Sequence, residues 1–164
     1  MLRLLAVAQH APRAHQDAVR TLMTEYAAMP HTLGRWTTAS ADLAALPFPF
    51  VPPHGTLLLA EIDTEPVGCG ALRIIAPGIG EVKRMYVRPA SRGRGVGEAL
   101  LRGLLSSAQA FALDRVRLDT APELSAAQAL YRRIGFVSIP RYLDEQLPDA
   151  LCFERPVRTA GYDP

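Results

Sequence analysis

The sequence is poor in the features that mark several classes of protein. Its 164 residues include two cysteines, Cys69 and Cys152, which lie far apart and form no Cys-x-x-Cys pair. This argues against a disulfide scaffold and indicates a reducing compartment, so we expect a cytoplasmic protein. Cys69 lies in an apolar, strand-like run without a histidine beside it. We therefore expect it to pack as a small apolar residue rather than act as a nucleophile.

Long hydrophobic runs and metal-ligand patterns are also missing. No stretch approaches membrane-spanning length, and the Leu-Leu-Ala-Val-Ala run near the start is shorter than a signal-peptide core. The four histidines lack ligand spacing. The sequence thus predicts no membrane association and no metal.

Neither sign of charge is in large excess, but the basic residues are unevenly placed along the chain. The net charge of +2 is too small to imply nucleic acid or membrane as a partner, and 49% hydrophobic residues indicate one ordinary globular domain over residues 1–164. Basic residues crowd around one glycine-rich segment: Lys83, Arg84, Arg88, Arg92, Arg94 and Arg102. This cluster indicates a local field for a polyanionic cofactor, with a solvated surface as the alternative.

The glycine-rich segment is Arg92-Gly93-Arg94-Gly95-Val96-Gly97, between a strand-like run and an amphipathic helical pattern. Such a turn presents free backbone N–H groups and the positive end of the helix dipole to an anion. The three glycines would let the main chain approach a pyrophosphate where a Cβ would collide, and the two arginines add charge. A P-loop is excluded because Glu98-Ala99 follows, and a dinucleotide fingerprint because the third glycine comes one residue early.

Hydrophobic periodicity and turn residues predict the order of elements along the chain. We expect seven strands near residues 2–8, 56–62, 67–75, 81–88, 115–120, 136–139 and 150–156, and helices near 19–29, 40–46, 96–112 and 125–134. Ser125 with Gln128 predicts a capping box at the last helix, which Gly135 would end. Pro47 to Pro53 cannot be regular structure, and its Phe48 and Phe50 either line a pocket or fill the core.

Three segments together resemble successive motifs of the GNAT (Gcn5-related N-acetyltransferase) family, in the right order and spacing. They are Glu81–Pro89, the loop Arg92–Gly97 and Ala127–Phe136. The resemblance covers residues 56–157; residues 1–55 match only in pattern and would form the acceptor side, and 158–164 are expected to be a frayed tail. It implies an α/β (α+β) fold with a mixed, mostly antiparallel, splayed sheet flanked by helices. The implied activity is transfer of an acetyl group from acetyl-CoA to a primary amine of a small molecule or peptide by direct attack.

The resemblance also implies where acetyl-CoA binds. The backbone of Met85, Tyr86 and Val87 would pair with the pantetheine arm. The remaining expected cofactor residues are Arg92, Gly93, Arg94, Gly95, Val96, Gly97, Glu98, Ser125, Ala127 and Arg133. Arg133 either reaches a phosphate or is solvated. Many members have an asparagine where this chain has Leu124, so that contact is absent or moved to Ser125.

Two residues carry the expected chemistry. Glu81 matches the catalytic glutamate of the histone-acetylating members, and strand alternation would place it on the face of Lys83, Met85 and Val87. Four residues of strand span about 13 Å, so a base there needs a water relay. The alternative for Glu81 is an ion pair with Lys83 or Arg84. Tyr131 matches the tyrosine that reaches the CoA sulfur, and a phenol stays protonated at neutral pH.

The acceptor is not readable from the sequence. The resemblance places Glu25, Tyr26, Trp36, Arg73, Tyr142 and Asp144 on elements that face it. Acidic members of this set would suit a cationic amine and Arg73 a carboxylate, so they point in opposite directions. Two other functions stay open: an acyl-CoA-sensing module without turnover, and a nucleic-acid-binding protein. The basic cluster has no interleaved aromatics beyond Tyr86 and no known binding motif, which argues against the latter. Homodimers are common in the family.

Overall fold

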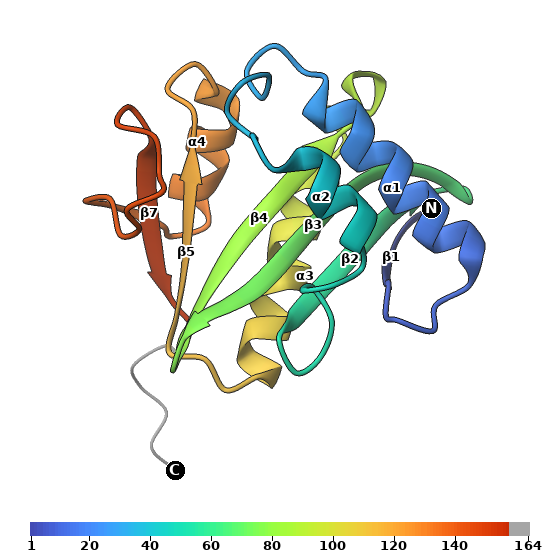
Figure 1. Cartoon of the computed structure of the whole chain (residues 1–164), viewed down its shortest axis with the longest axis horizontal. Helices are drawn as coiled ribbons and strands as arrows, with labels where there is room; N and C mark the ends of the chain where they lie inside the picture. Colours follow the sequence, from blue (N-terminus) through green and yellow to red (C-terminus); the bar gives the residue numbers. More distant parts are fainter. Residues whose placement is uncertain (158–164) are drawn as a thin grey trace.

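The computed structural model describes residues 1–157 (Figure 1), so the predicted tail at 158–164 lies outside the described residues. The helices and strands found agree in order with those predicted. They are β1 (Leu2–Ala6), α1 (Arg13–Ala27), α2 (Ala39–Ala45), β2 (Gly55–Ile62), β3 (Glu65–Ala76), β4 (Ile79–Val87), α3 (Val96–Ala110), β5 (Arg115–Thr120), α4 (Ser125–Arg133), β6 (Val137–Ile139) and β7 (Leu151–Pro156). A short 3₁₀ turn, Pro89–Ser91, joins β4 to the glycine-rich loop. No helix within residues 1–157 is both long and apolar enough to cross a bilayer.

The strands form one mixed sheet in the order β1-β2-β3-β4-β5-β7-β6. Neighbouring strands are antiparallel except β4 and β5, which are parallel, so the prediction of a mostly antiparallel mixed sheet is confirmed. β4 and β5 pair at three positions, the last being Glu81 with Arg117. Beyond this pair the two strands separate (Figure 1), which is the predicted splay.

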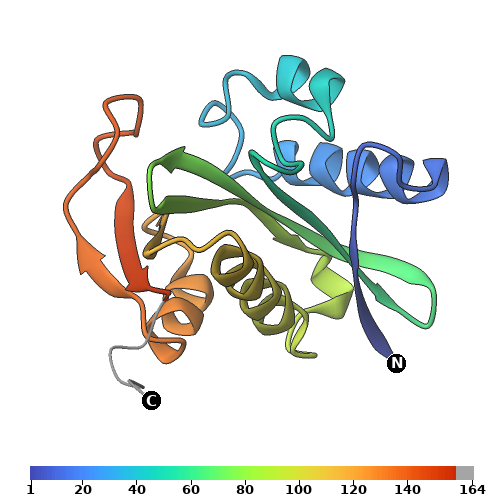
Figure 2. The same cartoon turned by 90° about the horizontal axis from the view of Figure 1, so that it is seen from below.

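Helices cover both faces of the sheet (Figure 2). α1 and α2 lie on one face and α3 and α4 on the other. Each face has its own apolar core, because the apolar side chains along one side of each long helix pack on alternate residues of the central strands. Leu22 and Met23 of α1 belong to one core, and Leu100 and Leu104 of α3 to the other. The central strands are therefore buried on both sides and hold the site rigidly.

A β-bulge interrupts β4 at Arg84, whose φ is +56°. Cys69 of β3 pairs with Tyr86, but Ala71 pairs with Lys83, so β4 carries one extra residue. The extra residue reverses the alternation: Met85 packs on the α3 side, and Tyr86 on the α1 side. The prediction that Glu81 shares a face with Met85 and Val87 is therefore wrong.

The start of α4 also differs from the prediction. The residue before the helix is Leu124, and no side chain caps it, so the capping box of Ser125 and Gln128 is absent. Gln128 instead donates from Nε2 to the carbonyl oxygens of Ala121 at 3.3 Å and Pro122 at 2.9 Å. It thus ties the helix to the loop after β5. Gly135, with φ +94°, ends the helix as predicted.

Candidate active site

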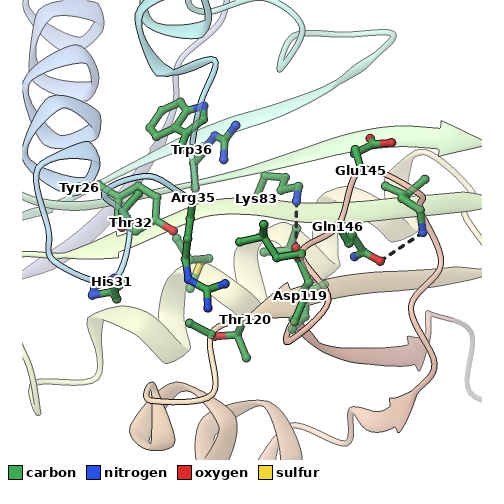
Figure 3. A pocket seen from close by; sticks show the side chains of 18 of the residues that line it. Tyr26, His31, Thr32, Arg35, Trp36, Lys83, Asp119, Thr120, Glu145 and Gln146 are labelled. Carbon is green, nitrogen blue, oxygen red and sulfur yellow. Dashed lines mark hydrogen bonds and ion pairs between the residues drawn. The ribbon is translucent and has the colours of Figure 1, made fainter.

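The separation of β4 and β5 coincides with a cavity of about 590 Å³ (Figure 3). Its apolar part is formed by Met85 of β4, Leu118 of β5, and Ala127 and Tyr131 of α4. Its polar part is formed by side chains from the end of α1 and the loop after it, from β4 and β5, and from the loop between β6 and β7. They include Tyr26, Thr32, Arg35, Trp36, Lys83, Asp119, Glu145 and Gln146.

The glycine-rich loop next to this cleft leaves backbone donors free. Gly95, with φ +79°, precedes α3, and the first helical bond runs from the Ala99 N–H to the Gly95 carbonyl at 2.9 Å. The N–H groups of Val96, Gly97 and Glu98 therefore have no acceptor within the helix. A Cβ built on Gly93 or Gly95 would meet no atom within 4 Å, so both glycines border open space. Free N–H groups at a helix start are a common anion-binding arrangement, and binding of coenzyme A phosphates here stays a prediction.

The side chains of the loop have different surroundings. Arg92 and Arg94 are exposed, and Arg92 Nε donates to the Val87 carbonyl at 3.1 Å. Val96 is buried in the α3-side core, so only its backbone can face a ligand. A Cβ on Gly97 would point at Leu130 Cδ2, 3.5 Å away. This position therefore lies where α3 contacts α4, and the approach of the Gly97 backbone to a phosphate stays a prediction.

Arg133 and Glu98 connect the two helices beside the loop. Arg133 Nη2 lies 2.8 Å from Glu98 Oε2, and Arg102 pairs with the other oxygen at 2.9 Å. The hydrogen bonds that Arg133 and Arg102 donate to Glu98 lower the pKa of the Glu98 carboxyl. Arg133 is largely exposed, so it remains able to reach an anion at the loop. Ser125 is exposed at the start of α4.

Glu81 is completely buried and has partners on both oxygens. Oε1 accepts a 2.8 Å hydrogen bond from Arg73 Nε, and Oε2 accepts a 2.7 Å bond from the Tyr142 hydroxyl. Lys83 Nζ lies 3.7 Å from Oε1. Glu81 is not among the residues that line the cavity. The geometry thus favours the ion-paired alternative, with Arg73 as the main cation in place of Arg84.

Arg84 points instead to the acceptor side of the cavity. Its guanidinium lies 3.7 Å from the ring centroid of Trp36, and its Nη2 lies 3.0 Å from Asp42 Oδ2. Asp42 also accepts a hydrogen bond from the Thr38 hydroxyl at 2.8 Å. Because the bulge in β4 turns Arg84 toward α2, this strand residue contacts Asp42 of the helix, 42 positions earlier in the chain.

An ion pair of Lys83 and Asp119 spans the gap between β4 and β5. Lys83 Nζ lies 2.9 Å from Asp119 Oδ1, and both residues line the cavity (Figure 3). Sequence reasoning missed Asp119, because nothing in its local pattern distinguishes it from a solvated strand residue. Its position follows from the parallel pairing of β4 with β5.

Tyr131 lies at the apolar end of the cavity. Its ring packs against Phe136 and Phe153, with centroids 6.1 Å and 5.9 Å away. Burial raises the pKa of the Tyr131 hydroxyl well above that of an ordinary phenol. It is therefore a protonated donor at neutral pH, as its predicted role requires.

Three of the six expected acceptor-side residues line the cavity: Tyr26, Trp36 and Arg73. Glu25, Tyr142 and Asp144 do not line it, and a contact of these three with the acceptor stays a prediction. Glu25 of α1 binds Arg88 at 2.8 Å and accepts a 3.2 Å hydrogen bond from the Tyr86 hydroxyl, which ties α1 to β4.

The other two of these residues lie in the β6–β7 loop. Tyr142 points to Glu81, and Asp144 is exposed while the next residue, Glu145, lines the cavity. In the proline-rich segment, Phe50 both fills the α1-side core and lines the cavity, whereas Phe48 is 55% exposed.

Cys69 is fully buried, and burial raises the pKa of its thiol to about 12, so it packs as predicted and is no nucleophile. Across residues 1–157, no group of three or more His, Cys, Asp or Glu side chains could hold a metal ion.

The strand order, the cleft at the split of the sheet and the glycine-rich helix start beside it match the fold of solved acyl-CoA N-acyltransferase structures. The model of the Acetyltransferase (GNAT) family matches residues 17–136. The chain belongs to this family.

Two curated relatives are similar over much of the sequence. An IAA acetyltransferase from Azospirillum brasilense is 35% identical over 137 residues, which cover 80% of this chain and 84% of that protein. An uncharacterized N-acetyltransferase from Schizosaccharomyces pombe is 33% identical over 102 residues, 61% of this chain and 63% of that protein.

Solved structures share the fold over nearly the whole chain. An acetyltransferase from Streptococcus agalactiae superposes with a TM-score of 0.78 at 20% identity and covers 94% of this chain and 98% of its own. The PaiA N-acetyltransferase from Thermoplasma acidophilum, solved in complex with coenzyme A, gives a TM-score of 0.72 at 14% identity, with 95% and 99% covered.

Proposed function

We propose that this protein is an N-acetyltransferase that transfers an acetyl group from acetyl-CoA to a primary amine by direct attack. The observation that carries the proposal is the junction of three features: the split between β4 and β5, the free N–H groups at the start of α3, and a cavity that reaches Met85 and Tyr131. Acetyl-CoA, when bound, supplies a thioester as the acyl donor.

The chain's own residues would hold the donor along β4 and α3. The bulge at Arg84 interrupts the ladder, and the backbone of residues 85–87 faces the gap where β5 has moved away. A main-chain N–H there would bind the thioester oxygen as it gains charge. The N–H groups of residues 96–98, with Arg92 and Arg94, would bind the pyrophosphate.

Tyr131 is proposed to protonate the departing thiolate. It lies in the cavity at the end where β4, β5 and α4 meet, and burial raises the pKa of its hydroxyl, so the hydroxyl is protonated at neutral pH and can donate a hydrogen bond to the sulfur as negative charge develops there. Because the thiol of Cys69 is buried and neutral, a covalent acyl-enzyme at that residue is disfavoured, which supports direct attack.

The amine must lose a proton, and two carboxylates compete for that role. Glu81, the residue that the resemblance favours, is enclosed by Arg73, Lys83 and Tyr142. Asp119 lines the cavity beside Lys83. We propose Asp119 as the group that faces the amine. Glu81 then serves as a positioning residue that holds Arg73 and Tyr142.

The direct test is release of CoA from acetyl-CoA in the presence of a panel of primary amines, with mass spectrometry of the product. Acetylated amine and stoichiometric CoA would support the proposal. Tight binding of acetyl-CoA in calorimetry without turnover of any amine would instead favour the alternative, an acyl-CoA-sensing module of the same fold.

A further inference from the structure

Arg35 reaches into the cavity from the loop between α1 and α2. Thr120 and the Lys83–Asp119 pair line the same cavity (Figure 3). The ion-pair partner of Arg35 is Asp149, in the loop between β6 and β7, 114 residues later in the chain. The pair therefore joins the two loops that border the polar part of the cavity.

The partner of Arg35 is unlike those of the other cavity cations. Arg73 is held by Glu81, which is 0% exposed; Lys83 by Asp119, 22% exposed; and Arg84 by Asp42, 37% exposed. Asp149 is 55% exposed. An exposed carboxylate returns to water at little cost, so Arg35 is the cavity cation whose main partner is replaced most easily.

Three hydrogen-bond donors around the cavity lack partners. They are Thr32 Oγ1, Arg84 Nε and Gln146 Nε2, which are buried, belong to residues that line the cavity, and make no hydrogen bond within the described part of the chain. Gln146 uses its other amide atom, Oε1, to accept from the backbone N–H of Tyr142 at 2.9 Å. Buried donors without acceptors are rare in native proteins and call for an oxygen-rich partner.

We propose that the amine acceptor carries a carboxylate, and that this carboxylate replaces Asp149 on Arg35. The inference rests on the proposed function and names the substrate class of the same site. The planar fork of an arginine matches a carboxylate with two parallel hydrogen bonds. Exchange of one carboxylate for another leaves the charge of the cavity unchanged, whereas a phosphate dianion would leave one extra negative charge beside Asp119 and Asp42.

The aromatic lining suggests the probes for the test. Tyr26 and Trp36 face the same cavity, with ring centroids 6.0 Å apart. Matched pairs of amines that differ by one carboxylate are therefore tyrosine with tyramine and tryptophan with tryptamine. We expect the wild-type kcat/KM to be about tenfold or more higher for the carboxylate member, as one charge-assisted bidentate contact would give.

Substitutions of Arg35 and Asp149 should change the preference for the carboxylate-bearing amine in opposite directions. Arg35→Gln should bring the ratio of kcat/KM within each pair to about one by lowering the value for the carboxylate member, since the bidentate contact is lost. Asp149→Asn should raise the ratio, because the competing carboxylate is gone. Arg115→Gln is the control: it removes another arginine of an ion pair, with Glu154, at a place that does not line the cavity. Its ratio should equal that of the wild type.

Binding is measured separately with 4-hydroxyphenylacetate, which has the ring and carboxylate but no amine. Stabilisation of wild-type protein against heat, lost in Arg35→Gln, supports the inference even if no amine of the panel is acetylated, in which case the proposed function alone fails. Three results would overturn the carboxylate assignment while acetylation itself stands. They are equal kcat/KM values within each amine pair, no effect of Arg35→Gln on the kcat/KM ratio, and a preference for 2-aminoethyl phosphate over β-alanine.

Discussion

The hydroxyl of Tyr142 donates a 2.7 Å hydrogen bond to Oε2 of Glu81, a residue 61 positions earlier. Tyr142 lies in the loop between β6 and β7, and Glu81 lies at the last pairing of β4 with β5. The bond ties a wall of the cavity to the point where the sheet splits. Burial, with the negative charge of Glu81 next to it, raises the pKa of the Tyr142 hydroxyl, so the donor stays protonated throughout the working range of pH.

Glu81→Gln and Asp119→Asn should therefore have different consequences. Loss of the Glu81 charge leaves Arg73 without its main buried partner, which should cost about 3 kcal/mol and lower Tm by roughly 6–12 °C. Asp119→Asn should lower turnover by about 10²-fold or more below the pKa of the acceptor amine, with a smaller loss of Tm. Thermal melts and pH–rate profiles of both variants provide the comparison. If Glu81→Gln has a normal Tm but loses turnover on the acidic side of its pH–rate profile, Glu81 is the base.

Tyr131→Phe removes only the hydroxyl and keeps the ring packed on Phe136 and Phe153. We expect kcat to fall by about 10²-fold or more, KM to change less, and Tm to change little. The loss should shrink with an acetyl thioester whose thiol is more acidic, because that leaving group needs less protonation. Steady-state kinetics with two thioesters measures this, and an almost normal kcat would assign Tyr131 to packing alone.

Gly95→Val should weaken the binding of CoA at least about tenfold, or 1.4 kcal/mol. The φ of +79° at this position is strained for a β-branched residue, and the new side chain would enter the open space that the N–H groups of α3 face. Gly34→Val is the matched control, since Gly34 has φ +75° and equally open surroundings on another loop. Calorimetry with CoA should show normal affinity for Gly34→Val; equal losses in both variants would contradict a specific role of the glycine-rich loop.

Stability should depend on pH through Glu25. The hydrogen bonds from Arg88 lower the pKa of this carboxyl below its ordinary value of 4.5. A lowered pKa in the folded state contributes stability above 4.5, which is lost as the pH falls toward the folded-state pKa. Glu25→Gln should reduce Tm by about 2–4 °C at pH 7, and the reduction should shrink only as the pH falls below about 4.5. Melts between pH 3 and pH 7 test this, and a Tm difference that does not vary with pH would refute it.

The local pattern of the sequence was enough for the order and type of the elements. Hydrophobic alternation marked the strands, and the stripe of α3 and its glycine-rich start marked the helix beside the cleft, because these signals come from residues close together in the chain. The positions of Tyr131 in the cavity and of the free N–H groups at residues 96–98 also followed from local motifs.

The bulge at Arg84 and the partners of Glu81 were decided only by tertiary structure. One extra residue in β4 reverses which side chains share a face, and its presence depends on the register with β3, which the sequence of β4 alone does not contain. Glu25 and Tyr142 bind Arg88 and Glu81, which are 63 and 61 positions away in the chain, so these partners are also selected only in the assembled fold.

The acceptor side of the cavity depends most on the assembled fold. Arg35 with Asp149, and Lys83 with Asp119, come from segments 114 and 36 residues apart. Each side chain alone resembles an ordinary surface charge, and its partner is selected by the distance between strands and loops that meet only after the sheet has formed. Charges act through space, whereas sequence patterns report on neighbours along the chain. The sequence could therefore predict a donor side from local motifs, whereas the charge pairs at the cavity were decided by the tertiary structure.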